Sequence, residues 1–122
     1  MAQQPRDLKE RTRDFALRVI RLYAALPKEA VAQVLGKQLL RSGTSVGAHY
    51  REATRGRSDA EFISKVEGGL AELKESAYWL ELLAGSGTVR ASRLIALTQE
   101  INELTAILVT CVKNAKSKRK SR

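Results

Sequence analysis

The amino-acid sequence predicts an all-α protein with the architecture of an antiparallel, up-down-up-down four-helix bundle. First, the helix-forming residues Ala, Leu, Lys, Arg and Glu are abundant, whereas proline occurs twice and aromatic residues make up only 5% of the 122 residues. Second, apolar residues recur every three or four positions in four long segments, as they do on one face of a helix. Third, only short connections separate these segments, and short connections make consecutive helices antiparallel neighbours.

The first two predicted helices meet at Pro27. Apolar or small residues follow one another at steps of three or four from Leu8 to Leu26 and define one face of the first helix. Pro27 ends this helix and suits the beginning of the next, where a backbone N–H is not needed. We predict the second helix over residues 28–55, with Gly56 in the position that follows its last residue.

The third and fourth predicted helices carry their own start and stop signals. Ser58-Asp-Ala-Glu61 has the form of a capping box, in which the Ser58 hydroxyl accepts a hydrogen bond from the backbone N–H of Glu61. The third helix is expected to end at the glycine-containing residues 85–87, and Thr88 is the expected N-cap of the fourth. The apolar face of the fourth helix runs from residue 94 to residue 111.

Charge divides the chain into the bundle, residues 1–112, and a basic C-terminal segment, residues 113–122. This segment holds six Lys and Arg residues and no acidic residue, out of a net charge of +9. Such a block is usually a solvated, disordered tail that binds polyanions, although a tail that only improves solubility fits equally well. No apolar run approaches the roughly 20 residues of a membrane span, and the N-terminus lacks the apolar region of a signal peptide. The sequence therefore predicts a cytoplasmic protein without membrane contact.

The second and third predicted helices carry opposite charge. Over residues 28–57 basic residues exceed acidic ones by four, and over residues 59–81 acidic residues exceed basic ones by four. Exposed ion pairs contribute only about 0.2–1 kcal/mol each, but they favour these two helices as neighbours. Part of the positive charge of the second helix is therefore expected to be neutralised within the protein.

Few side chains suit catalysis or metal binding. His49 is the only histidine and Cys111 the only cysteine, so one chain can form neither a disulfide nor a cluster of Cys and His ligands. The motifs GxxxxGK[ST] and GxSxG are absent. Helical ribonucleases of the HEPN superfamily carry an Arg separated from a His by four to six residues, whereas seven residues separate Arg41 from His49. The sequence therefore predicts no enzymatic activity, cofactor or metal, and a packing role for His49 with Glu52 as a hydrogen-bond partner.

Gly43 and Gly47 interrupt the second predicted helix. A glycine inside a helix costs about 1 kcal/mol relative to alanine, so close packing must compensate for it. With the turn between the second and third helices centred near residue 57, these glycines lie opposite Gly68 and Gly69. Small residues four positions apart let two helix backbones approach closely. We therefore predict a close crossing at which the two glycine pairs meet.

Residues 39–83 closely resemble the bacterial four-helix bundle proteins, also called 23S rRNA intervening-sequence proteins. Members of this family typically share the pattern R-S-x-x-S-[IV]-x-x-N-[IY]-x-E-[AG], then R-x-x-S-x-x-[ED]-F and a YWLELL-like segment, which is residues 78–83 here. The chain departs from the pattern at His49, where the family usually has Asn, so a role of that amide does not carry over. The matching positions are Arg41, Ser42, Ser45, Val46, Tyr50, Glu52, Ala53, Arg55, Ser58, Glu61 and Phe62.

The resemblance implies a homopentamer without enzymatic activity. Similar proteins include the accessory variability determinants of diversity-generating retroelements, which form barrel-shaped homopentamers and bind nucleic acid together with a reverse transcriptase. A ring would also bury a second set of apolar residues, which would otherwise form an unusually large patch on a monomer. This set comprises Ala16, Ile20, Tyr23, Ile63, Trp79, Leu82, Ile95, Ile107 and Val109.

Two hypotheses of different class follow for the function. The first is an oligomeric nucleic-acid-binding protein, whose basic residues contact the phosphates of RNA or DNA without reading the sequence. The second is an oligomeric scaffold or adaptor for a protein partner encoded nearby, such as a reverse transcriptase, with a tail that only improves solubility. The predicted phosphate-binding residues are Arg51, Arg55, Arg57, Lys116, Lys118, Arg119 and Lys120.

Overall fold

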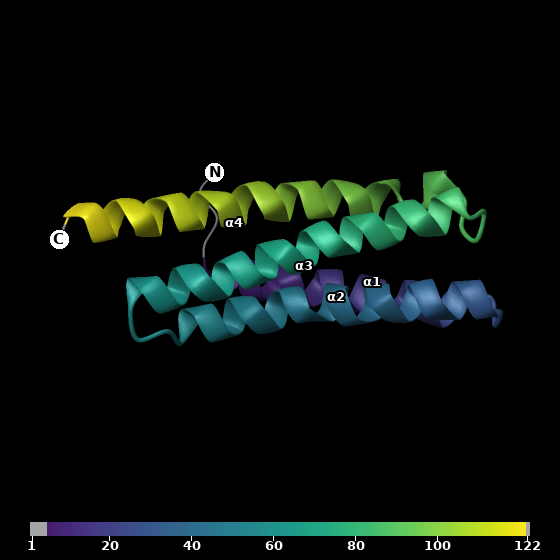
Figure 1. Cartoon of the computed structure of the whole chain (residues 1–122), viewed down its shortest axis with the longest axis horizontal. Helices are drawn as coiled ribbons and strands as arrows, with labels where there is room; N and C mark the ends of the chain where they lie inside the picture. The colour runs from purple at the N-terminus through teal and green to yellow at the C-terminus, as the bar shows by residue number, and fades with distance from the viewer. Residues whose placement is uncertain (1–4, 122) are drawn as a thin grey trace.

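The structure is a computed structural model that describes residues 5–121. It contains four long helices, and the turns between them lie alternately at the two ends of an elongated molecule (Figure 1). Residues 5–121 contain no strand, so the predicted all-α fold with four helices is confirmed. The elements are α1 (Pro5–Ala25), α2 (Ala30–Thr54), α3 (Asp59–Gly85), the short 3-10 helix η1 (Ala91–Arg93) and α4 (Ile95–Ser121).

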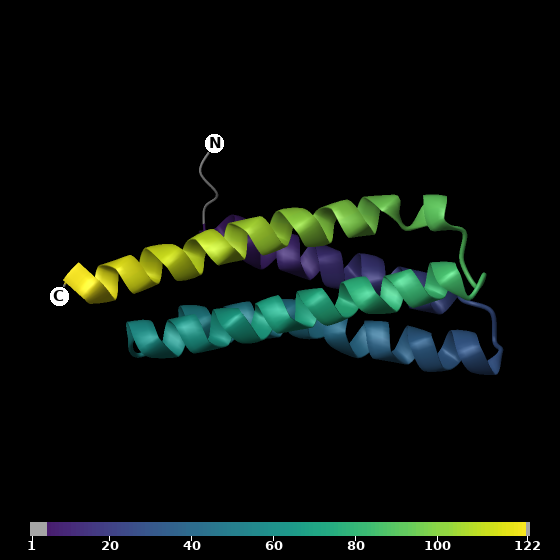
Figure 2. The same cartoon turned by 45° about the horizontal axis from the view of Figure 1, so that its top comes forward.

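Helices α2 and α3 form the centre of the molecule. They make the most extensive contact of any helix pair, while α1 packs against α2 and α4 packs against α3 (Figure 2). Helices α1 and α4 touch at few positions. The apolar faces expected from the sequence meet in a core whose largest side chains are less than 2% exposed. These are Phe15, Leu39, Leu73, Leu83, Leu104 and Leu108.

A cluster of ion pairs links α1 to α4. The Arg11 guanidinium donates to both carboxylate oxygens of Glu100, at 2.6 and 3.2 Å, and to Glu103 at 3.1 Å. The hydrogen bond to Glu100 raises the pKa of Arg11 above its ordinary value. Because the side chains of Arg11 and Glu100 are only 25% and 16% exposed, salt screens this pair less than an exposed one.

The helix ends follow the predicted signals except at the beginnings of α2 and α4. Helix α2 begins at Ala30 with Glu29 as its N-cap, so the prediction of a helix from residue 28, with Pro27 at its beginning, is wrong. The backbone N–H of Glu61 donates to the Ser58 hydroxyl at 3.1 Å, as the capping-box pattern requires. Helix α3 ends at Gly85, also as predicted. The prediction that Thr88 caps α4 is wrong, because α4 begins only at Ile95, after η1.

The connection from α3 to α4 is longer than expected because it closes one end of the core. Gly87 has a φ of +76°, a conformation that favours glycine. The chain then places Val89 and Leu94, which are 8% and 3% exposed, against the core. Thr88 forms a hydrogen bond with the Ser86 hydroxyl at 2.9 Å instead of capping α4.

The predicted crossing of two glycine pairs is wrong, because Gly43 and Gly47 face α1. A Cβ atom on Gly43 would lie 2.9 Å from a methyl group of Val19. A Cβ atom on Gly47 would lie 3.0 Å from the Thr12 hydroxyl oxygen. Both glycines therefore permit a close approach of α1 to α2, not of α3 to α2.

Gly68 and Gly69 do face α2, but they meet a histidine there. A Cβ atom on Gly68 would lie 2.8 Å from Nδ1 of His49. A Cβ atom on Gly69 would meet its nearest neighbours, the His49 Cβ and the Val46 carbonyl oxygen, only at 3.6 Å. Gly68 therefore makes room for the imidazole ring, whereas a Cβ atom on Gly69 would make only ordinary van der Waals contacts.

The basic C-terminal segment is helical, so the expectation of a disordered tail is wrong for residues 113–121. Helix α4 continues to Ser121, and Val112 and Ala115 still pack on the bundle at 7% and 8% exposure. Lys and Arg are good helix formers, and positive charges near the C-terminus of a helix interact favourably with its dipole. Arg122 lies outside the described residues.

Part of the second apolar set packs in or against the chain's own core. Ile63, predicted to be at a subunit interface, is only 5% exposed, and Tyr23, Trp79 and Ile107 pack partly against the same core. Ile63 is therefore not available to a subunit interface, and the other three side chains would contribute only part of their surface to one. The large apolar side chains that stay exposed, at 42–62%, are Ile20, Val31, Val34, Tyr78 and Ile95.

Helix α4 is long and apolar enough to cross a membrane, by length and composition only. Its most apolar window has a mean hydropathy of 1.3, although the sequence was expected to contain no such segment. One helix of this kind is weak evidence for a membrane span. Its apolar residues Leu104 and Leu108 lie in the core, and Glu100 on the same face binds Arg11, so the bundle already covers this face of the helix.

Candidate nucleic-acid interface

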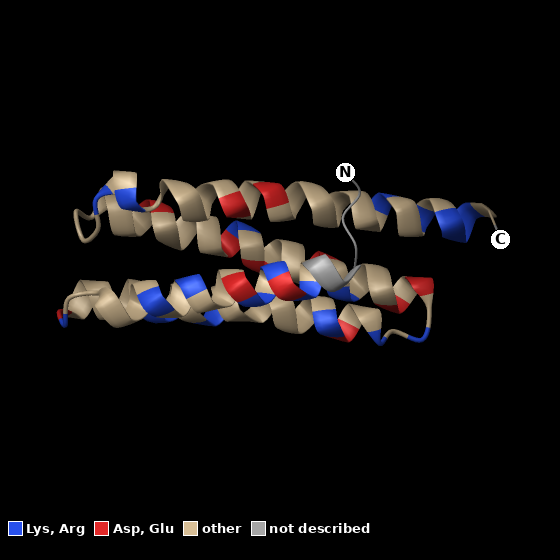
Figure 3. Ribbon diagram, turned by 180° about the vertical axis from the view of Figure 1, so that it is seen from behind, with Lys and Arg blue, Asp and Glu red and all other residues tan. Residues whose placement is uncertain are grey.

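Two basic segments that are far apart in the sequence lie at the same end of the molecule. Arg51 and Arg55 lie at the end of α2, Arg57 lies in the turn to α3, and residues 116–120 lie in the last turns of α4. Figure 3 shows both groups at the end that holds the C-terminus. All seven predicted phosphate-binding side chains are exposed. We call this part of the molecule the basic end.

Most of the positive charge at the basic end has no acidic partner. Within residues 8–121, only one of these seven side chains forms an ion pair with a nitrogen–oxygen distance of at most 4.0 Å. The Nζ atom of Lys116 lies 3.6 Å from a carboxylate oxygen of Glu67. Unpaired cations that stand close together create a positive potential, which favours the binding of polyanions. The six cations outside these ion pairs are Arg51, Arg55, Arg57, Lys118, Arg119 and Lys120.

A pocket of about 680 Å³ opens at the basic end, between the turn from α2 to α3 and the last part of α4. Its lining combines the apolar side chains of Tyr50, Phe62 and Cys111 with the cations Arg57 and Lys118. Burial raises the pKa of the Tyr50 phenol and of the Cys111 thiol, so both groups stay protonated at neutral pH. Sequence reasoning missed this pocket because elements distant in the chain form it together.

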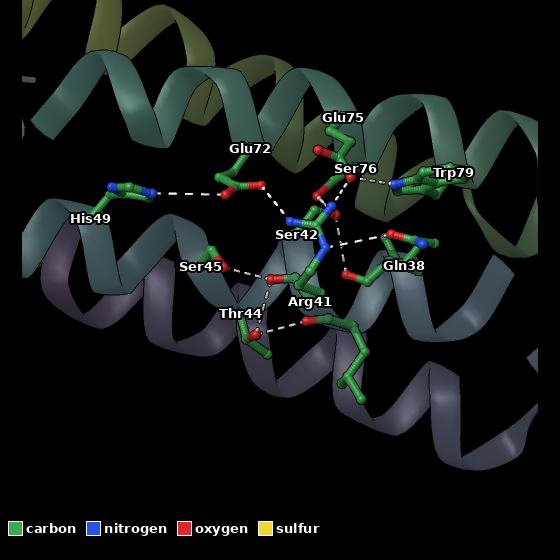
Figure 4. Close-up of polar contacts among 12 residues, drawn as sticks. Gln38, Arg41, Ser42, Thr44, Ser45, His49, Glu72, Glu75, Ser76 and Trp79 are labelled. Atoms are coloured by element: carbon green, nitrogen blue, oxygen red, sulfur yellow. Dashed lines mark hydrogen bonds and ion pairs between the residues drawn. The ribbon is translucent and has the colours of Figure 1, made fainter. Parts of the chain in front are cut away.

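Arg41, singled out as a family-pattern residue, connects α2 to α3 (Figure 4). Its guanidinium donates to Glu75 and, at 3.5 Å, to Glu72. Glu75 also accepts a hydrogen bond from the indole N–H of Trp79 at 2.9 Å. Because the Arg41 side chain is 51% exposed, each pair contributes only about 0.2–1 kcal/mol. These contacts neutralise Arg41, as expected for part of the charge on this helix, and leave it outside the basic end.

His49 lies in the same contact and has acidic neighbours on both helices. Its Nε2 is 3.8 Å from a carboxylate oxygen of Glu72, and its Nδ1 is 3.9 Å from one of Glu52, both too long for hydrogen bonds. The predicted hydrogen bond between His49 and Glu52 is therefore wrong. Nδ1 is buried without a hydrogen-bond partner, because Gly68 packs against the ring. Among the described residues, no cluster of three or more His, Cys, Asp or Glu side chains suits a metal ion.

The serines of the pattern satisfy their hydroxyl groups within α2 and α3. The hydroxyl oxygens of Ser42 and Ser76 lie 2.8 Å apart, and both residues are 0% exposed. The Ser45 hydroxyl donates to the backbone carbonyl of Arg41 at 2.7 Å. The Ser42–Ser76 pair therefore links α2 to α3, whereas Ser45 bonds within α2, and neither contact points to a reaction centre.

Removing the two hydroxyls of the buried pair should cost less than the sum of the two single changes. We expect Ser42→Ala and Ser76→Ala each to lower the free energy of unfolding by about 1 kcal/mol, because each leaves a buried hydroxyl with a poorer partner. The double variant leaves none, so the two losses should not add. Urea unfolding of the three variants measures this, and strictly additive losses would show that the pair is not coupled.

The profile of the 23S rRNA-intervening sequence protein family matches residues 6–110 of the sequence. The chain belongs to this family. A solved structure of a protein of unknown function from Bacteroides thetaiotaomicron, described as a member of the S23 ribosomal protein family, is 35% identical to this chain. It matches with a TM-score of 0.85 over 91% of this chain and 99% of that one. A comparison with curated proteins gives no significant match.

In this member of the 23S rRNA-intervening sequence family, the basic end combines residues that the family profile matches with residues that follow the matched part of the chain. Arg51, Arg55 and Arg57 lie within the matched residues 6–110, whereas residues 116–120 follow them. The family pattern contributes mainly the contact between α2 and α3. The cation cluster as a whole is visible only in the folded chain.

Proposed function

We propose that the protein is a non-enzymatic nucleic-acid-binding protein that holds RNA or DNA by phosphate contacts at its basic end. Lys and Arg side chains that neutralise phosphates release condensed counterions, and this release supplies most of the affinity when no sequence is read. Contacts of this kind fix the position of a strand without selecting its sequence.

The observation that carries this proposal is the convergence of two basic segments on one end of the bundle. Six of the seven predicted phosphate-binding side chains there have no ion pair among the described residues. Cations without an ion pair also lie at the opposite end, where Lys28, Arg90 and Arg93 are found, but the basic end gathers twice as many. Exposed cations gathered in this number create a positive potential that attracts polyanions. The gathered charge is therefore better explained by a polyanionic partner.

We also propose that the protein assembles into a homopentameric ring. The family resemblance supports it, and so do Val31 and Val34, which lie one turn apart on α2 and are 53% and 62% exposed. Apolar side chains exposed together often mark a contact with another protein. A ring would present several basic ends to one nucleic acid, and such multivalent binding strengthens weak contacts.

Neutralising the basic end should weaken nucleic-acid binding and reduce its dependence on salt. We would replace Arg51, Arg55 and Arg57 by Gln in one variant and Lys118, Arg119 and Lys120 by Gln in another. Gln preserves helix propensity, and substitution leaves the buried Ala115 in place, which deletion of residues 113–122 would remove. The slope of log K against log salt should flatten by about 0.7–0.9 for each phosphate that the variant no longer neutralises. Fluorescence anisotropy with labelled RNA and DNA measures both quantities.

The matched control removes three positive charges from the opposite end. Lys28 lies in the turn between α1 and α2, and Arg90 and Arg93 lie in the connection between α3 and α4, at the other end of the molecule (Figure 1). Replacing all three by Gln changes the net charge equally and should alter binding less. If the basic-end variants kept the original affinity and slope, the proposal would be wrong and the scaffold hypothesis would be favoured.

A further inference from the structure

The pocket at the basic end has a lining that suits a ligand with both an apolar body and an anionic group. Three elements line this open pocket: the beginning of α1, the turn from α2 to α3 with its flanking residues, and the last part of α4. Its volume of about 680 Å³ falls within the range of about 300–1,000 Å³ that is usual for small-molecule sites. The apolar part of the lining comprises Leu8, Tyr50, Ala53, Phe62, Cys111 and Ala115.

The two cations in the lining come from different elements, and the lining also holds one carboxylate, that of Asp59 at the beginning of α3. Arg57 belongs to the turn between α2 and α3, and Lys118 belongs to α4. Both side chains are exposed, and neither has an ion pair within the described part of the chain. An anion bound between them would gain two charge-assisted contacts. Its apolar portion would reach the wall that Phe62 and Ala115 help to form.

We propose that this pocket binds a nucleoside phosphate, with the base against the apolar wall near Phe62 and the phosphate between Arg57 and Lys118. The inference rests on the proposed function and deepens it. It specifies that the bound nucleic acid has an unpaired nucleotide at the basic end, because a base within a duplex cannot enter a pocket. Base stacking on protein side chains tolerates any sequence, in keeping with a site that reads no sequence.

Single-stranded and double-stranded ligands of equal charge separate this inference from general phosphate binding. We would measure the affinity of the full chain for a short oligoadenylate strand, for an RNA duplex with the same number of phosphates, and for AMP. The single strand should bind about tenfold more tightly than the duplex, as expected for the insertion of one base. Weak binding of AMP, detected by its effect on amide NMR signals of the pocket residues, would identify the pocket as the site.

Blocking the pocket without removing a charge tests its role directly. Ala115 lies in the lining, so Ala115→Leu fills it, and Asn114→Trp covers it from an exposed position. Both variants should lose the preference for the single strand and keep the affinity for the duplex. Ala106→Leu is the matched control, because Ala106 is exposed on the same helix and outside the pocket lining. Circular dichroism shows whether each variant is folded.

The possible outcomes distinguish failure of this inference from failure of the proposed function. Equal affinity for the single strand and the duplex, unchanged by Asn114→Trp, would overturn the pocket as a base site and leave phosphate binding intact. Binding of AMP without binding of either RNA would support the pocket with a free nucleotide as its ligand and overturn the proposed function. Absence of binding to all three ligands would overturn both.

Discussion

Replacing Gly43 by leucine is expected to lower the free energy of unfolding by about 3 kcal/mol or more, at the upper end of the cost of overpacking a core. Even the Cβ atom would lie 2.9 and 3.0 Å from the two methyl groups of Val19, closer than real Cβ contacts allow. Val19 is 0% exposed, and its branched side chain has one strongly preferred rotamer in a helix. Val19 or the backbone that carries it must therefore shift to admit any side chain at Gly43.

Alanine substitutions at two glycines separate the packing effect from helix propensity. Alanine at an interior helix position gains about 1 kcal/mol over glycine, so a site with space should be stabilised. Gly69→Ala places its Cβ 3.6 Å from the nearest atoms and is expected to be neutral or stabilising. Gly43→Ala should destabilise by about 1–3 kcal/mol despite the same gain. Urea unfolding at a fixed protein concentration measures both, because self-association would make stability depend on concentration.

A second substitution should relieve the clash at Gly43. Val19→Ala removes the two methyl groups that the new Cβ would meet, although it leaves a cavity of its own. The double variant Val19→Ala/Gly43→Ala should therefore lose less stability than the sum of the two single variants. Equal stability of Gly43→Ala and the unmodified protein would show that α1 and α2 are not in close contact at this point.

The glycines also show how far the sequence determines the packing. The pattern and the cost of glycine correctly predicted that Gly43 and Gly47 lie against a neighbouring helix. The sequence pattern could not show which neighbouring helix the glycines contact. Helix α2 packs against both α1 and α3, and successive residues of a helix point about 100° apart. The register argument addressed only which residues of α3 lie level with Gly43, and the contact of Ser42 with Ser76 shows that it was shifted by about one helical turn. It did not fix the direction in which the glycine faces, and Val19 occupies that side.

The basic end was likewise only partly predictable from the sequence. Composition alone singled out residues 116–120 as basic, and the same composition suggested disorder, because charge runs outside a core are usually disordered. The buried Ala115 and the good helix propensity of Lys and Arg keep α4 intact instead. The approach of this helix to Arg57 depends on the packing of α4 against α3. No local pattern could therefore have predicted the pocket that lies between them.

In solution the protein is expected to have a mass near five times the 13.5 kDa of one chain. Val31→Glu/Val34→Glu should reduce this mass toward that of a single chain, because the two exposed side chains would place unpaired charges in a buried subunit interface. The fold of one chain should tolerate both changes, since the side chains are 53% and 62% exposed. Ala106→Glu, at an exposed position of α4, is the matched control. Light scattering after size exclusion measures the masses.

The same variant should also weaken nucleic-acid binding, although neither valine lies at the basic end. A pentamer carries five basic ends, and linking several weak sites can raise the overall affinity by about 10²- to 10⁴-fold without any new contact. Separated subunits should lose this gain in affinity. Their affinity should also depend less on salt concentration, because each subunit contacts fewer phosphates at once. Anisotropy titrations at protein concentrations where the variant is monomeric measure this loss. A 13.5 kDa monomer of the unmodified protein at micromolar concentration would overturn both the ring and the multivalent binding that depends on it.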